Sequence, residues 1–162
     1  MKNLFKLLWT GALAYALCCA VYACSEEEDC SMVDNRGMMV CNFFTLDPET
    51  GAPVQAVLDS LTVTARGTDS VIINRMAEVS TITLPLRYTA DSTEFVFRYT
   101  AHLTDTLVIR HTNTPYFVSM DCGYQMRQSI TEERHTQRYL DSVYVSHPET
   151  SINGTENIQL FY

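Results

Sequence analysis

The strongest constraint on the fold of this chain is a period of two in its apolar residues. Leu61, Val63 and Ala65 alternate with threonines, and similar alternation recurs along the chain. Successive side chains of a β-strand point to opposite faces, so this pattern predicts strands with one buried face. About nine such segments are recognisable, at residues 38–45, 61–65, 71–73, 81–86, 95–99, 107–111, 116–126, 139–146 and 157–162.

Turn residues separate these segments. The stretch 47–51, Asp-Pro-Glu-Thr-Gly, has the composition of a turn. Residues 130–137 are the best helix candidate, but they are few and polar, and we expect a turn or a loop there. Many short strands rich in Thr, Val, Tyr and Phe predict an all-β domain, either a sandwich or a small barrel. We favour a single antiparallel β-sandwich, immunoglobulin-like or similar, over residues 38–162.

The first 23 residues have the organisation of a secretory signal peptide. Lys2 and Lys6 give a positive start, and residues 7–23 are apolar apart from Thr10 and end in small residues. A transmembrane helix is the alternative, but it needs about 20 apolar residues, slightly more than this run offers. We therefore expect a cleaved signal peptide over residues 1–23.

Cys24 follows directly. The sequence Val-Tyr-Ala-Cys at 21–24 resembles the lipobox of bacterial lipoproteins, whereas the residues before Cys18 and Cys19 fit that pattern poorly. The resemblance implies that Cys24 carries a covalent lipid and begins the mature chain. Several acyl chains at this site would anchor the protein firmly, because one chain alone binds only marginally.

An acidic run comes next and begins a tether that we expect over residues 24–37. Such runs are usually solvated spacers. This one also resembles the surface-export signal of Bacteroidota lipoproteins, which implies the outer face of the outer membrane. A lipid anchor facing the periplasm is the alternative. The residues of the run are Ser25, Glu26, Glu27, Glu28 and Asp29.

Charge excludes one class of partner. Without residues 1–23 the chain has 139 residues, with nine arginines, no lysine and 19 acidic residues, so its net charge is −10. Contact with phosphates requires a basic face, and we therefore expect no nucleic-acid partner. The expected partners are the outer membrane, through the lipid, and an unknown protein or glycan.

Three cysteines remain beside Cys24, which suits an oxidising compartment. Cys30, Cys41 and Cys122 allow one disulfide in three pairings. We favour Cys30–Cys122, because it would fix the start of the domain to a distant strand and close a long loop. Cys41 lies in an apolar run and is expected to be a buried free thiol. No Cys-x-x-Cys pair indicates zinc or redox chemistry.

Four aspartates, Asp59, Asp69, Asp105 and Asp141, each precede a Ser or Thr at the start of an apolar segment. We expect them to bond nearby backbone amides in turns. Calcium is the weaker reading, because the compact spacing of a calcium loop is missing. We therefore expect no cofactor and no metal site.

No pattern indicates catalysis. The four histidines lack ligand spacing, and His111 is expected to be an exposed residue at the end of a strand. The arginines Arg127, Arg134 and Arg138 surround His135; we expect them to pair with neighbouring carboxylates rather than to form an anion-binding patch. We expect a non-enzymatic protein without catalytic residues.

The whole layout resembles a family of uncharacterised small lipoproteins of Bacteroidota, a domain of unknown function. The resemblance rests on Cys24, the early Cys30, the segments 81–86 and 105–109, and the aromatic segment 116–119 that leads to Cys-Gly-Tyr at 122–124. It implies the Cys30–Cys122 pairing and no catalytic residues. Cys41 departs from the pattern.

These features predict a membrane-anchored outer-membrane or surface lipoprotein, which acts as a non-enzymatic binding or envelope-structural module. A carbohydrate-recognition accessory protein is the main alternative, and it predicts a flat, exposed row formed by Tyr116, Phe117 or Tyr124. A thiol enzyme that uses Cys122, and a pilus-type subunit with a donated last strand, are further alternatives.

Overall fold

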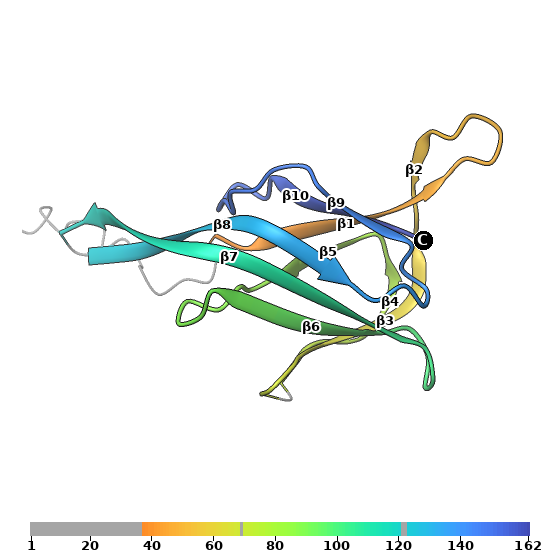
Figure 1. The fold of residues 1–162 in the computed structure, drawn as a ribbon, viewed down its shortest axis with the longest axis horizontal. Coiled ribbons are helices and arrows are strands. Elements are labelled where there is room, and N and C mark those ends of the chain that lie inside the picture. Colours follow the sequence, from red (N-terminus) through yellow and green to blue (C-terminus); the bar gives the residue numbers. More distant parts are fainter. Residues whose placement is uncertain (1–36, 69, 121–122) are drawn as a thin grey trace, which may run out of the picture.

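The structure is a computed structural model that describes residues 37–68, 70–120 and 123–162. Within these residues the chain forms ten strands and no helix, arranged in two five-stranded sheets (Figure 1). No helix in this part of the chain is long and apolar enough to cross a membrane. The predicted lipid site Cys24, the acidic run 25–29 and the disulfide partners Cys30 and Cys122 lie outside the described residues.

The first sheet joins the start of the described chain to its end. Its order is β2-β1-β10-β9, and β5 pairs with β1 on the side away from β10. All of its pairs are antiparallel except β1 with β10, which is parallel and places Phe43 opposite Leu160. The strands are β1 (Met39–Leu46), β2 (Pro53–Gln55), β5 (Thr81–Leu84), β9 (Ser142–Val145) and β10 (Glu156–Phe161).

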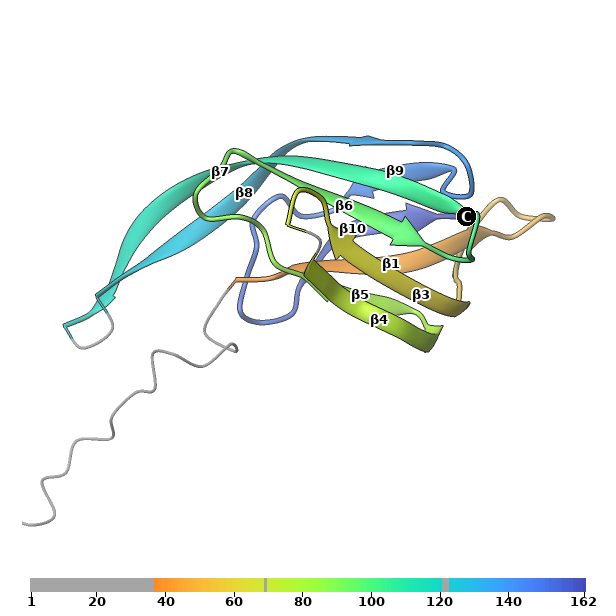
Figure 2. The ribbon, with the colours of Figure 1, turned by 90° about the horizontal axis from the view of Figure 1, so that it is seen from below.

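The second sheet is antiparallel throughout, in the order β4-β3-β6-β7-β8. Its last two strands are the longest of the molecule, with 16 and 13 residues. They extend beyond the other strands, away from the end where the C-terminus lies (Figures 1 and 2). The strands are β3 (Leu58–Ala65), β4 (Ser70–Val79), β6 (Ser92–Arg98), β7 (Thr104–Ser119) and β8 (Gly123–His135).

One apolar core lies between the two sheets. Inward side chains of both sheets supply it, at alternate positions of strands such as β6, whose buried residues are Thr93, Phe95 and Phe97. Alternation of this kind is what a sheet with one buried face requires. The largest fully buried apolar residues are Met39, Phe43, Leu61, Leu84, Phe95, Phe97, Leu107, Ile109, Leu140, Ile158 and Leu160. The all-β sandwich predicted from the sequence is confirmed.

Two predicted segments were wrong. Residues 116–126 form no single strand, because β7 ends at Ser119 and β8 begins at Gly123. Gly123 has a φ of 64°, a conformation that glycine adopts without steric cost. Residues 130–137 were expected to be a turn or a loop, yet β8 runs to His135, since cross-strand pairing with β7 outweighs the weak local preference of a polar segment.

Candidate functional site

The far half of the β7–β8 hairpin leaves the sandwich as a two-stranded arm. We define the arm as residues 114–120 and 123–127. The ladder between β6 and β7 ends at Arg110, and the segment 148–151 meets β8 only near residues 128–130, through a bridge of Ser129 with Glu149 and bonds to Pro148 and Thr150. Among the described residues, no third strand pairs with the arm. At about 3.3 Å per residue, β7 runs about 20 Å along it.

One face of the arm is apolar and exposed. The register places Pro115 opposite Met126 and Phe117 opposite Tyr124. Opposite residues, and residues two apart, share a face of the ribbon. Phe117 is 53% exposed and Tyr124 75%, and Met120 beyond them is 90% exposed. Soluble monomers rarely expose so many large apolar side chains together, and such groups mark interaction surfaces.

The aromatic residues of the arm do not form a flat row. The rings of Phe117 and Tyr124 meet edge to face, with centroids 5.5 Å apart and planes inclined by 68°. Tyr116 lies on the opposite face, where its hydroxyl donates to Gln125 Oε1 at 3.0 Å. The Arg127 guanidinium lies 5.2 Å from the Tyr116 ring centre, a cation–π distance. This geometry differs from the flat platform that the carbohydrate-recognition alternative predicted.

A joint of hydrogen bonds fixes the arm where it leaves the sandwich. The Asn113 amide donates to the carbonyls of Arg87, Tyr88 and Ala90, at 3.2, 3.2 and 2.7 Å. The Gln128 amide donates to the Arg87 carbonyl at 3.2 Å and to Asn113 Oδ1 at 2.8 Å. These bonds tie both strands of the hairpin to the segment between β5 and β6. The sequence contained no recognisable signal for this joint, because its acceptors are backbone carbonyls distant in the chain.

His111 belongs to this joint, and its predicted exposure was wrong. The residue is 2% exposed, and its Nε2 lies 2.9 Å from the Thr93 hydroxyl, which accepts from the Arg87 amide. Burial lowers the pKa of His111, which favours the neutral ring. The error arose because the apolar alternation ends at His111 whereas β7 continues to Ser119.

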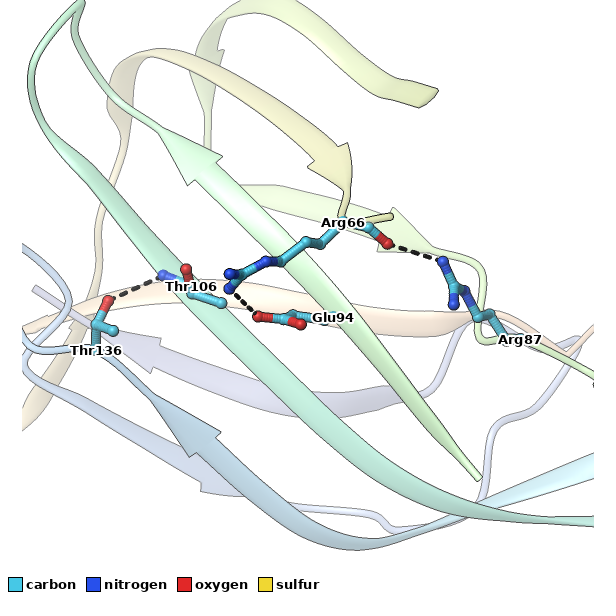
Figure 3. Close-up of polar contacts among 5 residues, drawn as sticks. All are labelled: Arg66, Arg87, Glu94, Thr106 and Thr136. Carbon is cyan, nitrogen blue, oxygen red and sulfur yellow. Dashed lines mark hydrogen bonds and ion pairs between the residues drawn. The ribbon is translucent and has the colours of Figure 1, made fainter. Parts of the chain in front are cut away.

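The segment between β5 and β6 is held from its other side as well. The Arg87 guanidinium donates to the Arg66 carbonyl at 2.8 Å (Figure 3). Arg66 in turn forms an ion pair with Glu94, its guanidinium reaching across toward β6 (Figure 3). The turn after β3, the strand β6 and the arm joint are thereby linked through one segment.

The described chain begins beside the arm. Gly37 lines a cavity of about 340 Å³ together with Tyr116, Met126 and Arg127 of the arm and residues 149–152. It also lines a second cavity of about 730 Å³, beside Leu86 and Tyr88. A Cβ at Gly37 would lie 2.9 Å from the Thr150 hydroxyl, too close for an ordinary contact. The backbone therefore packs against Thr150 at the proximal part of the arm.

Asp105 acts at long range, not in the local turn predicted for it. Its carboxylate accepts from the Thr136 hydroxyl at 2.7 Å and from the amides of residues 138, 139 and 140, at 2.9 to 3.0 Å. Thr136 Oγ1 also accepts from the Thr106 amide at 2.9 Å (Figure 3). Burial alone would raise the pKa of Asp105, but these hydrogen bonds stabilise the charged form and leave the pKa below its usual value.

Among the described residues, Asp59 and Asp141 form no metal-binding group with Asp105. Asp69 lies outside the described residues. Within the described part, no three His, Cys, Asp or Glu side chains are placed to share a metal ion. The calcium reading therefore has no site in this part of the chain.

The charge and thiol predictions have mixed outcomes. Arg134 pairs with Glu132 at 2.7 Å, as expected, whereas Arg127 faces the Tyr116 ring. Cys41 is a fully buried free thiol, which confirms the prediction. Burial raises the pKa of Cys41 far above its usual value, which disfavours the reactive thiolate.

Comparison with known protein families identifies the domain. A family described as a family of unknown function (DUF6452) matches residues 60–162, which include strands β4 to β10 and the whole arm. No curated protein and no solved structure matches the chain.

Proposed function

We propose that this chain, which belongs to the DUF6452 family of unknown function, is a lipid-anchored envelope protein of a Bacteroidota bacterium with a non-enzymatic binding or structural role. Cys24 carries the lipid, and the acidic run 25–29 directs the protein to the outer face of the outer membrane. The sandwich is a scaffold that presents the arm. No cofactor and no metal take part.

The observation that supports this proposal is the position of Gly37. It packs against Thr150 and lines a cavity with Tyr116 and Arg127, so the tether starts on the side from which the arm projects. Gly37 lies thirteen positions after Cys24. An extended chain spans up to about 3.5 Å per residue, so the tether reaches about 45 Å. An exposed apolar arm on that side suits a protein whose contacts are made near the membrane.

The buried reactive groups support a non-enzymatic role. Cys41 is inaccessible and held in its thiol form by burial, and His111 is enclosed in the arm joint. Neither is available to a substrate in solution. Several large apolar side chains are instead exposed, which suits contact rather than chemistry.

The lipid anchor is tested by metabolic labelling of cells with a fatty acid analogue. The wild-type protein should incorporate the label and sediment with membranes. Cys24→Ala should lose both properties, whereas Cys19→Ala should keep them. Labelling that persists in Cys24→Ala would refute Cys24 as the lipid site. Digestion of the protein by protease on intact cells tests surface display, and protection until lysis would place it on the periplasmic face.

We also propose the Cys30–Cys122 disulfide. Gly37 lies seven positions after Cys30, enough for an extended chain to span about 24 Å. From Tyr116, which shares a cavity with Gly37, to Met120 the strand covers about 13 Å. The tether is thus long enough to bring Cys30 to the end of the arm. Peptide mapping without reductant should find the bridged pair, and free thiols at both positions would exclude it.

A further inference from the structure

The charge distribution separates the end of the arm from the rest of this acidic protein. Residues 112–131 contain one acidic residue, Asp121, and one basic residue, Arg127, and no other charged residue. The whole chain has a net charge of −8. A negatively charged membrane surface repels acidic proteins, and that repulsion acts over about a Debye length, roughly 10 Å. The nearly uncharged arm can therefore approach such a surface at low electrostatic cost.

The chemistry of the exposed side chains suits the boundary between lipid headgroups and acyl chains. Phe117, Met120 and Tyr124 are apolar or amphipathic, and all three are more than half exposed. Tyrosine is enriched at membrane interfaces because its ring is apolar and its hydroxyl remains hydrated. A two-stranded ribbon is marginally stable alone in water, so a surface that covers its apolar face would also stabilise it.

We propose that the arm tip, defined as Phe117, Val118, Met120 and Tyr124, is a second membrane contact that inserts into the interface of the bilayer that holds the lipid anchor. This inference rests on the proposed lipidation of Cys24. Without the Cys30–Cys122 bridge, the reach of the tether, about 45 Å, exceeds the length of the arm, about 20 Å. With the bridge, the chain that carries the lipid is joined to the arm itself. Because both begin at the level of Gly37 and Tyr116, the tip can touch the bilayer while the lipid remains inserted.

A lipid anchor together with an inserted tip would fix the orientation of the domain, which a lipid alone does not. A protein held by one lipid alone has no fixed orientation relative to the membrane. The joint of Asn113 and Gln128 fixes the arm to the sandwich, so insertion of the tip would orient the whole domain. The end that carries the β1–β2 hairpin and the C-terminus would then point away from the membrane (Figures 1 and 2).

Tryptophan fluorescence of the lipidated protein in vesicles tests this inference. Trp9 is the only tryptophan of the chain and lies in the predicted signal peptide, so the mature wild type provides the background. Met120→Trp and Tyr124→Trp place reporters at the tip. Val54→Trp is the matched control, because Val54 is 47% exposed on β2 at the opposite end of the molecule. The vesicles contain phosphatidylethanolamine and phosphatidylglycerol, with or without brominated acyl chains.

The tip reporters should shift to shorter emission wavelengths on reconstitution and lose intensity in the brominated vesicles, whereas Val54→Trp should do neither. Water-like, unquenched emission from both tip reporters in protein that floats with the vesicles would overturn tip insertion and leave the lipid anchor intact. A blue shift without quenching by bromine would show the tip covered by protein, and would also overturn it. Failure of the purified protein to float would overturn the anchor and this inference together.

Discussion

Strand β7 has two halves that behave in opposite ways. From Thr104 to His111 buried residues alternate with half-buried or exposed ones, and Asp105, Leu107, Ile109 and His111 lie in the interior. From residue 112 to 119 no residue is buried, although pairing with β8 continues. The first half also pairs with β6 on its other side, whereas the second half pairs with β8 alone. The two halves therefore differ both in the number of paired strands and in whether a second sheet covers them.

The two halves are therefore stabilised by different interactions. The sandwich half is stabilised by burial of apolar surface, which is worth about 1.5–3 kcal/mol for each large side chain. The arm half lacks that contribution and depends on its ladder, on the Asn113–Gln128 joint and on whatever covers its apolar face. A ladder alone is a weak source of stability. The proposed membrane contact of the tip would add the apolar burial that this half lacks.

The first test of this difference truncates one phenylalanine to alanine in each region. Phe97→Ala removes a fully buried ring and should lower the free energy of unfolding by about 3–5 kcal/mol. Phe117→Ala removes a half-exposed ring whose aromatic neighbour is Tyr124, and should cost at most about 1 kcal/mol. Urea unfolding of the non-lipidated protein, followed by circular dichroism, measures both values. Equal losses would show that the arm belongs to the core.

Asp105 provides the next largest effect, because it fixes the segment after β8 to the sandwich. Asp105→Asn replaces a buried carboxylate that accepts four hydrogen bonds, and should cost about 3 kcal/mol. Asp59→Asn is the control, since Asp59 is exposed on β3 and should change stability by less than about 0.5 kcal/mol.

The effect of Asp105 should also depend on pH. Its folded-state pKa lies below the unfolded value of about 3.9. The stabilisation is therefore complete above pH 4 and is lost as the pH falls through the folded pKa. Urea titrations between pH 7 and pH 2 should show wild type and Asp105→Asn converging in acid. A constant difference across that range would contradict the account of Asp105.

The sequence predicted the sandwich far better than the arm. Alternation in segments such as 61–65 and 95–99 reports a buried face, and those segments became β3 and β6. The arm has no buried face, so its sequence indicates strand but not where a strand ends. Residues 116–126 were therefore predicted as a single strand, although they contain the end of β7 and the start of β8. Asp105 was recognised as a polar residue before a strand, but its partners lie more than 30 residues away. Long-range polar pairing leaves no local pattern in a sequence.

The joint is the connection between the two regions, and its removal should loosen the arm selectively. Asn113→Ala leaves three carbonyls without their side-chain donor and should cost about 2 kcal/mol. Thr112→Ala, at an exposed neighbouring position, should cost less than about 0.5 kcal/mol. Hydrogen exchange should show faster exchange of arm amides in Asn113→Ala, with sandwich amides less affected. Unchanged exchange in the arm would mean that the joint does not hold it.

The smallest predicted effect lies where the chain meets the arm. Gly37→Ala brings a Cβ within 2.9 Å of the Thr150 hydroxyl, which itself donates to the Gln128 carbonyl at 3.3 Å. The hydroxyl must move, and we expect a loss of about 1 kcal/mol. In the background of Thr150→Ala the same substitution should cost less, because the clashing atom is absent. A double-mutant cycle measures this coupling. Additive losses would show that Gly37 does not pack against Thr150, and would remove the structural reason for placing the start of the tether beside the arm.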